Sequence, residues 1–185
     1  FVNGGTAVYR GAYDDTYFSN FTPEIYRSND NIWKKMSKTN FRRNYHSTSL
    51  LLPDGRIFVA GGDAWNAQFF YPPYLFTKDN KGKTILAKRP EIKELKKTII
   101  NRKEQIMLVD DSDDVEKISL ISTGSTTHAQ ASELKYLSLD FKKISKNKIK
   151  FSIPDNKNNV SDGTYLIFTV SGSGIPSEGK ITYIK

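Results

Sequence analysis

Two histidines, one of them beside a tyrosine, are the residues of this chain best suited to metal chemistry. The 185 residues include only two histidines and no cysteine. His46 directly follows Tyr45, and the second histidine is His128. Imidazole nitrogens combined with a phenol oxygen suit a redox-active copper better than a closed structural zinc site, which prefers cysteine and histidine. The lack of cysteine also excludes a disulfide framework and a thiolate-bound metal within this chain.

The positions of these three residues set a geometric condition on a shared site. Neighbouring side chains on a regular strand point to opposite faces, so Tyr45 and His46 can face one metal only where the strand start is bent. His128 stands between Ser125-Thr126-Thr127 and Ala129-Gln130-Ala131, whose small side chains suit a tight projecting loop. The alternative interpretation is that each histidine only forms hydrogen bonds and that Tyr45 only packs at a strand start.

The first part of the chain has the pattern of a propeller repeat. The pairs Gly4-Gly5 and Gly61-Gly62 enclose Tyr26 and Trp33. A repeat of about 50 residues with these features is typical of one kelch blade, and the alternative is a generic β-meander. Pro53-Asp54-Gly55 is a strong hairpin turn between two apolar runs. We therefore predict that residues 1–76 form the terminal kelch blade region.

The remainder of the chain predicts a β-sandwich. The prolines of Tyr71-Pro72-Pro73-Tyr74 cannot donate to a strand ladder and suit a domain boundary. Apolar and polar residues then alternate in several short runs, of which residues 137–141 and 149–153 are the clearest. Such runs, separated by Gly, Asn, Asp and Pro, are typical of an immunoglobulin-like sandwich. We predict this domain over residues 77–185, no helix, and an all-β fold for the whole chain.

Several motifs occur along the chain in a fixed order. They are Arg43 to Ser47, Leu51 to Arg56, Gly61-Gly62, Tyr71 to Phe76, Arg89 to Ile92, Gly124 to His128, and Gly174 to Ser177. In this order they resemble the last kelch blade and the C-terminal domain of the galactose oxidase and glyoxal oxidase family, the copper radical oxidases. The resemblance implies that the sandwich is an early-set domain and that the chain is the C-terminal part of a longer, secreted protein.

The resemblance also implies an activity and a ligand set. Members of this family oxidise a primary alcohol or an aldehyde with O2 and release H2O2. Tyr45 matches the axial phenol, which is also the proton acceptor, and His46 matches an equatorial imidazole ligand of Cu2+. His128 matches the second imidazole, which a loop of the sandwich carries into the central channel of the propeller.

Half of the family's site is expected outside this chain. The radical cofactor is a second tyrosine linked to a cysteine in earlier blades, and this chain has no cysteine. We therefore expect the chain alone to be inactive and to need the upstream blades of the same protein. The substrate would be a small alcohol, an aldehyde or a carbohydrate, and no substrate-binding residue is assigned. The alternative is a non-catalytic kelch and immunoglobulin-like module that binds carbohydrate or protein.

Other functions find little support in the sequence. The net charge is +8, but no basic patch interleaved with aromatic residues indicates a nucleic-acid partner. No apolar run approaches the roughly 20 residues of a membrane helix. The acidic residues 110–114 lack the glycine and glutamate of an EF-hand loop and are interpreted as a solvated turn. Trp65 could line the mouth of a site, but a packing role is favoured.

Overall fold

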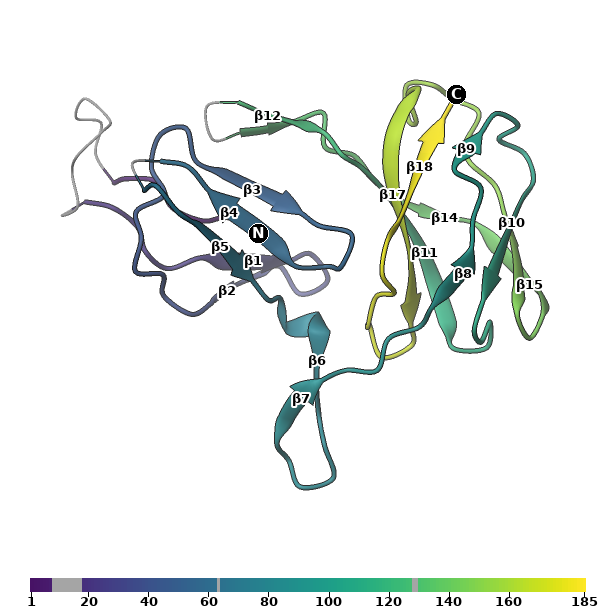
Figure 1. The fold of residues 1–185 in the computed structure, drawn as a ribbon, viewed down its shortest axis with the longest axis horizontal. Coiled ribbons are helices and arrows are strands. Elements are labelled where there is room, and N and C mark those ends of the chain that lie inside the picture. Colours follow the sequence, from purple (N-terminus) through teal and green to yellow (C-terminus); the bar gives the residue numbers. More distant parts are fainter. Residues whose placement is uncertain (8–17, 63, 128–129) are drawn as a thin grey trace. The chain divides into compact units, whose positions relative to one another are not determined.

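The computed structural model describes residues 1–7, 18–62, 64–127 and 130–185, and these residues form an all-β protein (Figure 1). The one helical segment in these ranges is a 3-10 turn, η1 (Pro73–Leu75), at the paired prolines. The prediction of an all-β chain is confirmed. No helix in the described ranges is long and apolar enough to span a membrane.

The chain divides into two compact units that are interleaved in sequence. The first unit comprises Phe1–Leu51, Ile57–Phe70 and Ser125–Ser132. The sandwich unit comprises Leu52–Arg56, Tyr71–Gly124 and Glu133–Lys185. A turn from the first half of the sequence therefore belongs to the sandwich unit, and a hairpin from the second half belongs to the first unit.

The first unit contains three small antiparallel sheets. β1 (Glu24–Arg27) pairs with β2 (Ile32–Lys35), and β12 (Ser125–Thr127) pairs with β13 (Gln130–Ser132). A three-stranded sheet is formed by β3 (Thr48–Leu51), β4 (Ile57–Ala60) and β5 (Ala67–Phe70). Gly61-Gly62 follows the last residue of β4, where the chain leaves the sheet.

The three-stranded sheet has two unequal faces. Ile57 and Val59 of β4 are buried on one face. On the other face Leu50, Phe58 and Phe69 are aligned by the strand register. Leu50 is 41% exposed and Phe69 is 49% exposed. A row of apolar side chains that is exposed to this extent is typical of a surface that another segment or protein covers.

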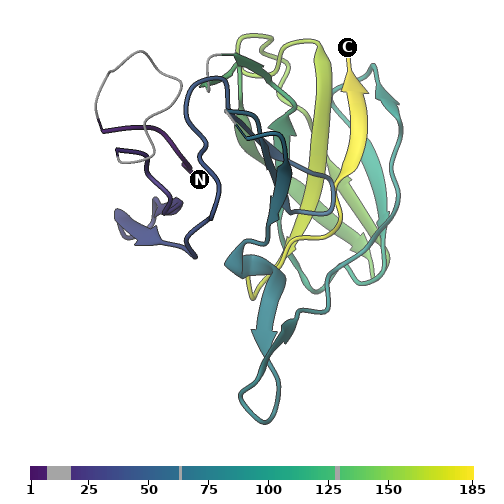
Figure 2. The same ribbon diagram turned by 60° about the vertical axis from the view of Figure 1, so that its left-hand side comes forward.

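The sandwich unit is built from two sheets around one core. The first sheet has the order β15 (Phe141–Ser145), β16 (Lys148–Phe151), β10 (Gln105–Val109), β8 (Ile92–Glu94). The second has the order β14 (Tyr136–Leu139), β11 (Val115–Ser122), β17 (Gly163–Ser171), β18 (Lys180–Ile184), β9 (Thr98–Ile99). β6 (Phe76–Lys78) and β7 (Thr84–Leu86) form a separate hairpin that extends away from these sheets (Figure 2).

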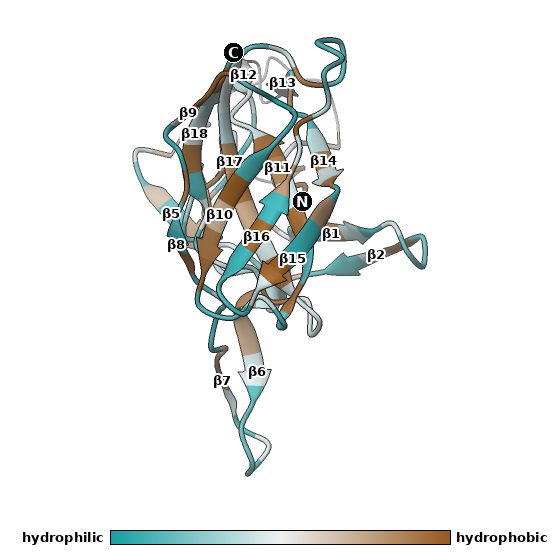
Figure 3. Ribbon diagram, turned by 90° about the vertical axis from the view of Figure 1, so that its right-hand side faces the viewer, coloured by the Kyte–Doolittle hydropathy of each residue, from teal (hydrophilic) through white to brown (hydrophobic). Residues whose placement is uncertain are grey.

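Alternation along the strands explains how the sandwich fills its core. In β16 the side chains of Ile149 and Phe151 are buried, whereas Lys148 is exposed and Lys150 is half-buried. Burial also alternates along β10, where Gln105, Met107 and Val109 are buried and Ile106 is exposed. Hydrophobic and hydrophilic positions are interspersed along β15 and β16 in Figure 3. Residues from both sheets, among them Met107, Ile118 and Ile167, join in one hydrophobic cluster. Burial of these side chains is the main favourable term in the folding of this unit.

Candidate metal centre

Tyr45 and His46 lie side by side at an irregular strand start. They occupy a turn directly before β3, in the first unit. Their rings are stacked, with centroids 3.8 Å apart and an interplanar angle of 26°. His46 has a φ of 60°, in the left-handed region that residues other than glycine seldom adopt. This backbone conformation is the bend that adjacent side chains need in order to approach each other.

The strained histidine is accommodated by the glycine pair. A Cβ atom at Gly61 would lie 2.5 Å from the backbone oxygen of His46, which is closer than a side chain tolerates. A Cβ atom at Gly62 would lie 3.0 Å from the backbone nitrogen of Asn44. Both glycines have positive φ angles, which they adopt without the cost that a side chain would add. The backbones of the segment around His46 and of Gly61-Gly62 therefore lie in close contact.

The buried side chain of Arg43 forms hydrogen bonds that fix the segment before β3 against residues 61–68. Arg43 is 0% exposed, and its Nη1 donates to the backbone oxygens of Gly61 and Asn66, at 2.9 and 3.2 Å. Its Nη2 donates to Asn66 Oδ1 at 2.6 Å and to Gln68 Oε1 at 3.2 Å. Burial lowers the pKa of the Arg43 guanidinium. The hydrogen bonds compensate for part of the cost of placing this charge away from water.

The neighbours of the Tyr45–His46 pair are buried, whereas the pair is presented outward. Asn44 donates from Nδ2 to Ser19 Oγ at 3.0 Å, and Ser47 donates from its hydroxyl to the Arg43 backbone oxygen at 3.3 Å. Asn44 and Ser47 are 4% and 5% exposed, whereas Tyr45 is 36% exposed and His46 is exposed. A packed scaffold under an accessible phenol and imidazole is the arrangement that a preorganised ligand pair requires.

His128 lies outside the described residues, so its convergence with Tyr45 and His46 stays a prediction. The strands on either side of it, β12 and β13, are in register with Thr127 opposite Gln130. They belong to the same compact unit as Tyr45 and His46, and β13 contacts β3. The described ranges contain no group of three or more His, Cys, Asp or Glu residues arranged to hold a metal, a set in which tyrosine is not counted.

Arg89, which the sequence analysis placed only in a motif, joins distant parts of the sandwich unit. Its Nη1 donates to the backbone oxygen of Asp54 at 2.6 Å, and its Nε donates to that of Pro176 at 2.8 Å. Nη2 donates to the backbone oxygen of Ser177. Three of the recognised motifs therefore meet at one guanidinium, whose pKa is lowered by burial. Their order along the chain indicated a family, but not that they touch.

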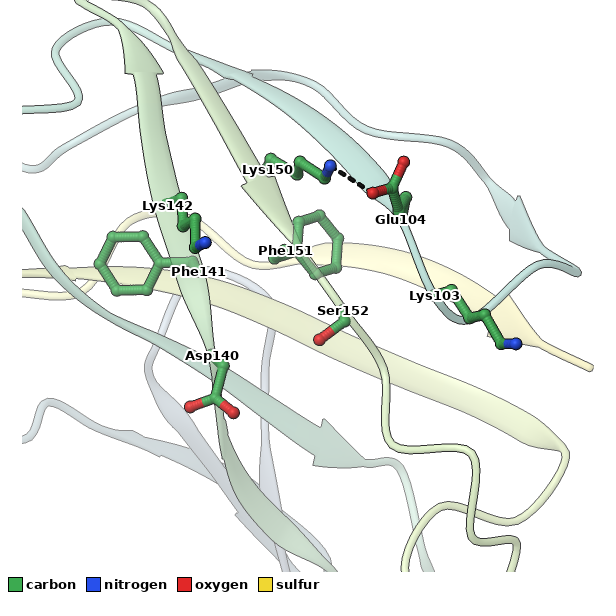
Figure 4. Close-up of a pocket in the computed structure, with 8 residues that line it drawn as sticks. All are labelled: Lys103, Glu104, Asp140, Phe141, Lys142, Lys150, Phe151 and Ser152. Carbon is green, nitrogen blue, oxygen red and sulfur yellow. Dashed lines mark ion pairs between the residues drawn. The ribbon is translucent and has the colours of Figure 1, made fainter.

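Two further features bear on the choice of site. The side chain of Trp65 is fully exposed, at 104% of its reference area, so the prediction of a packing role is wrong for this chain. A shallow depression also lies on the sandwich, where Lys150 forms an ion pair with Glu104 (Figure 4). Phe141 and Phe151 are part of its lining, but no histidine or tyrosine is. The depression thus contains none of the three candidate copper ligands Tyr45, His46 and His128.

Known proteins similar to this chain belong to the family that the motifs indicated. Residues 89–184, more than half of the chain, match the family model described as "Galactose oxidase-like, Early set domain". A galactose oxidase of Gibberella zeae is 31% identical over 96% of this chain and 26% of its own length. An aldehyde oxidase of Arabidopsis thaliana is 23% identical over 87% of this chain and 30% of its own length.

A solved structure has the same fold. It is described as a novel fungal alcohol oxidase with catalytic diversity among the AA5 family, in complex with copper. The TM-score is 0.82 with 23% identity, over 94% of this chain and 37% of the other chain.

The chain belongs to the galactose oxidase-like family with an early-set domain, as the motifs predicted. It spans 26% and 30% of the lengths of the two curated relatives.

Proposed function

We propose that this chain is the C-terminal portion of a copper radical oxidase that converts a primary alcohol or an aldehyde with O2 and produces H2O2. The observation that carries the proposal is the stacked Tyr45–His46 pair, whose close approach depends on the left-handed backbone of His46. Backbone strain of this kind clusters at functional sites, because the surrounding structure must hold it in place. Membership of the galactose oxidase-like family supports the same chemistry.

The donor atoms of the chain suit copper. Tyr45 Oη, an imidazole nitrogen of His46 and an imidazole nitrogen of His128 would hold the ion. Nitrogen and oxygen donors of this kind favour Cu(II) in a tetragonal arrangement. When bound, copper supplies a one-electron couple to the reaction. Arg43, Asn44 and Ser47 would keep the first two ligands in position through the contacts described above.

Tyr45 has a second role in the proposal. The conversion of an alcohol to an aldehyde removes two electrons and two protons. O2 takes up these two electrons and two protons and becomes H2O2. In the proposal, Tyr45 Oη accepts the proton of the alcohol hydroxyl as the general base. In the proposal, His46 and His128 would hold the copper ion and are not assigned this proton. The second electron needs a partner that this chain cannot form, since it has no cysteine for a thioether-linked tyrosine.

The apolar row of the three-stranded sheet supports the proposal of upstream blades. Phe58 and Phe69 lie edge to face, with ring centroids 5.7 Å apart, and Leu50 continues the row. We propose that residues 1–76 are the terminal region of a kelch propeller and that a preceding blade of the same protein covers this row. We also propose that the parent protein is secreted, as the relatives' family implies.

The test compares this chain with the longer protein that contains its preceding blades. Both are loaded with copper and given galactose, glycerol and a glyoxal-type aldehyde under air, and peroxide release is measured. We expect turnover from the longer protein only, lost in Tyr45→Phe and in His128→Ala. Tyr26→Phe, on exposed β1, is the control and should retain activity.

Copper binding by the 185-residue chain separates the metal site from the activity. Electron paramagnetic resonance of the Cu(II)-loaded chain should show nitrogen coupling that weakens in His46→Ala and in His128→Ala. Copper-dependent turnover by the chain alone would refute its dependence on the upstream half. A spectrum that neither substitution changes would refute the metal site.

A non-catalytic binding module that keeps the fold is the second candidate, and the sequence of the earlier blades decides between the two. A parent sequence without a Cys–Tyr pair in the earlier blades would support this candidate. Such a protein would bind a carbohydrate or protein partner and release no peroxide in the same assay.

A further inference from the structure

The sandwich unit contains an asparagine with the acceptor pattern for an N-linked glycan. The tripeptide Asn159-Val160-Ser161 fits the rule Asn-x-Ser/Thr, in which x is not proline. A second tripeptide of the same type, Asn20-Phe21-Thr22, occurs in the first unit. Such a pattern is a hypothesis until its structural context is known, because an occupied asparagine must keep a bulky glycan in solvent.

The turn around Asn159 provides that context. Asn159 and Ser161 are exposed, whereas Val160 between them is 0% exposed. The buried valine anchors the tripeptide in the hydrophobic cluster of the sandwich. Among the residues that the structure describes, the side-chain amide of Asn159 has no hydrogen-bond partner. The nitrogen that would carry the glycan is therefore accessible in the folded protein.

Backbone contacts hold this turn in place. The backbone nitrogens of Asn159 and Val160 both donate to the backbone oxygen of Asn156 at 3.0 Å. The backbone oxygen of Val160 accepts from the buried Arg102 Nη1 at 2.6 Å. None of these contacts involves the amide of Asn159, so a glycan at this nitrogen would leave the turn unchanged.

The same features at Asn20 are less favourable. The oxygen of its side-chain amide accepts a hydrogen bond from the backbone nitrogen of Thr22 at 3.0 Å. Phe21 and Thr22 are half-buried, and Pro23 follows directly. The backbone oxygen of Phe21 accepts from the nitrogen of Thr39 at 2.8 Å. This tripeptide is packed into the first unit and serves as an internal comparison.

We propose that Asn159 is an N-glycosylation site of this protein. The proposal rests on the secretion that forms part of the proposed function. In the reaction, Asn159 Nδ2 attacks the anomeric carbon of a glycan carried by a polyprenyl diphosphate. The new C–N bond replaces the C–O bond to the diphosphate, which leaves with the lipid, and the amide loses one proton to a base. No electrons are gained or lost in this transfer.

The experiment expresses the chain behind a secretion signal in a eukaryotic host. Material from the medium and from the membrane fraction is digested with peptide N-glycosidase in heavy-oxygen water, and tryptic peptides are analysed by mass spectrometry. Cleavage after Lys157 and Lys180 places Asn159 in one peptide, and cleavage after Arg10 and Arg27 places Asn20 in another. We expect heavy-oxygen aspartate at position 159.

Variants identify the acceptor. Asn159→Gln and Ser161→Ala should remove the shift in gel mobility that the glycosidase produces, and Ser161→Thr should retain it. Asn158→Gln is the matched control, since Asn158 is the exposed neighbour on the same turn but is not part of the pattern. An unmodified Asn159 peptide in both fractions would overturn the proposal, whatever the state of Asn20.

The outcomes for the glycan and for the oxidase are independent. Peroxide release by the longer protein with an unmodified Asn159 would overturn only the glycan site. A glycosylated Asn159 on a protein that releases no peroxide would overturn only the oxidase.

Discussion

At the scale of residues, the contact between Gly61 and the backbone of His46 is the most demanding feature of the candidate centre. His46 can adopt a φ of 60° there because Gly61 leaves room for its carbonyl. The stacked ring of Tyr45 then follows from the direction in which His46 turns the chain. The candidate ligands therefore depend on a residue that has no side chain.

We predict that Gly61→Ala destabilises the chain and weakens copper binding. A positive φ costs alanine about 1–2 kcal/mol, and the contact with the His46 oxygen adds to this cost. Gly82→Ala is the matched control, because Gly82 has a similar φ of 77° but no atom within 4 Å of its added Cβ. Urea unfolding and copper titration of both variants provide the measurement. Equal losses of stability in the two variants would contradict the role of the contact.

Arg43 is the second residue on which the centre depends. We predict that Arg43→Ala lowers the free energy of unfolding by about 3 kcal/mol, since it leaves four acceptor contacts unmade in a buried place. Arg27→Ala, which removes an exposed arginine with one ion pair, should change it by less than about 1 kcal/mol. The two free energies are compared by urea unfolding, and a small effect at Arg43 would show that the segment is held by other contacts.

At the scale of elements, the turn Leu52–Arg56 belongs to the sandwich unit and accepts hydrogen bonds from other residues of that unit. The backbone nitrogen of Gly179 donates to the oxygen of Pro53 at 2.7 Å, and Tyr74 Oη donates to the oxygen of Gly55 at 2.6 Å. Together with Arg89, these donors satisfy three successive carbonyls of the turn. The backbone of this turn is therefore fixed by hydrogen bonds from within the sandwich unit.

Tyr74 makes the stability of this turn sensitive to high pH. Burial raises the pKa of the Tyr74 phenol to about 12, whereas the unfolded phenol titrates near 10. Between these pH values the Tyr74 phenol keeps its proton in the folded state and loses it in the unfolded state. The stabilisation is therefore complete below pH ~10, and the free energy of unfolding falls as the pH rises towards ~12. We predict that Tyr74→Phe costs about 1 kcal/mol at neutral pH and reduces this fall. Unfolding measured between the two pH values tests this, and an unchanged slope would contradict it.

At the scale of the whole molecule, each of the two compact units is made of segments that are not continuous in sequence. The hairpin Ser125–Ser132, which includes the candidate ligand His128, belongs to the first unit. The turn Leu52–Arg56 belongs to the sandwich unit. Each unit thus includes a segment that the other part of the sequence encodes, so neither unit corresponds to one continuous stretch of the chain.

The row formed by Leu50, Phe58 and Phe69 supplies a prediction at this scale. We predict that Phe69→Ser changes the stability of the 185-residue chain by less than about 1 kcal/mol and that of the longer protein by about 2–3 kcal/mol. The reason is that the proposed preceding blade would bury a ring that is 49% exposed here. Ile106→Ser, at a 44% exposed position of the sandwich, should have the same small effect in both. Equal effects of Phe69→Ser in the two proteins would refute the buried row.

Local sequence determined the strands, the turn and the family of this protein. The alternation around Ile149 and Phe151 predicted a half-buried strand, because successive side chains of a strand point to opposite faces and only one face packs against the core. Pro53-Asp54-Gly55 predicted the hairpin turn because Gly55 can take the φ of 82° that it has there. Tyr45, His46 and His128 were selected by residue type, by the adjacency of the first two, and by their place in the motifs of the resembled family. The strands and the turn need only neighbours within a few positions, whereas the family rests on the order of the motifs along the chain.

The tertiary structure decided how those pieces act on one another. The left-handed conformation of His46 arises where Gly61 approaches it, and the burial of Arg43 arises from acceptors on β5 and the loop before it. Trp65 was expected to pack, but its environment is set by which segments surround it and not by its neighbours in sequence. Spacing along a chain cannot encode such contacts, because they join residues whose separation in sequence has no relation to their separation in space.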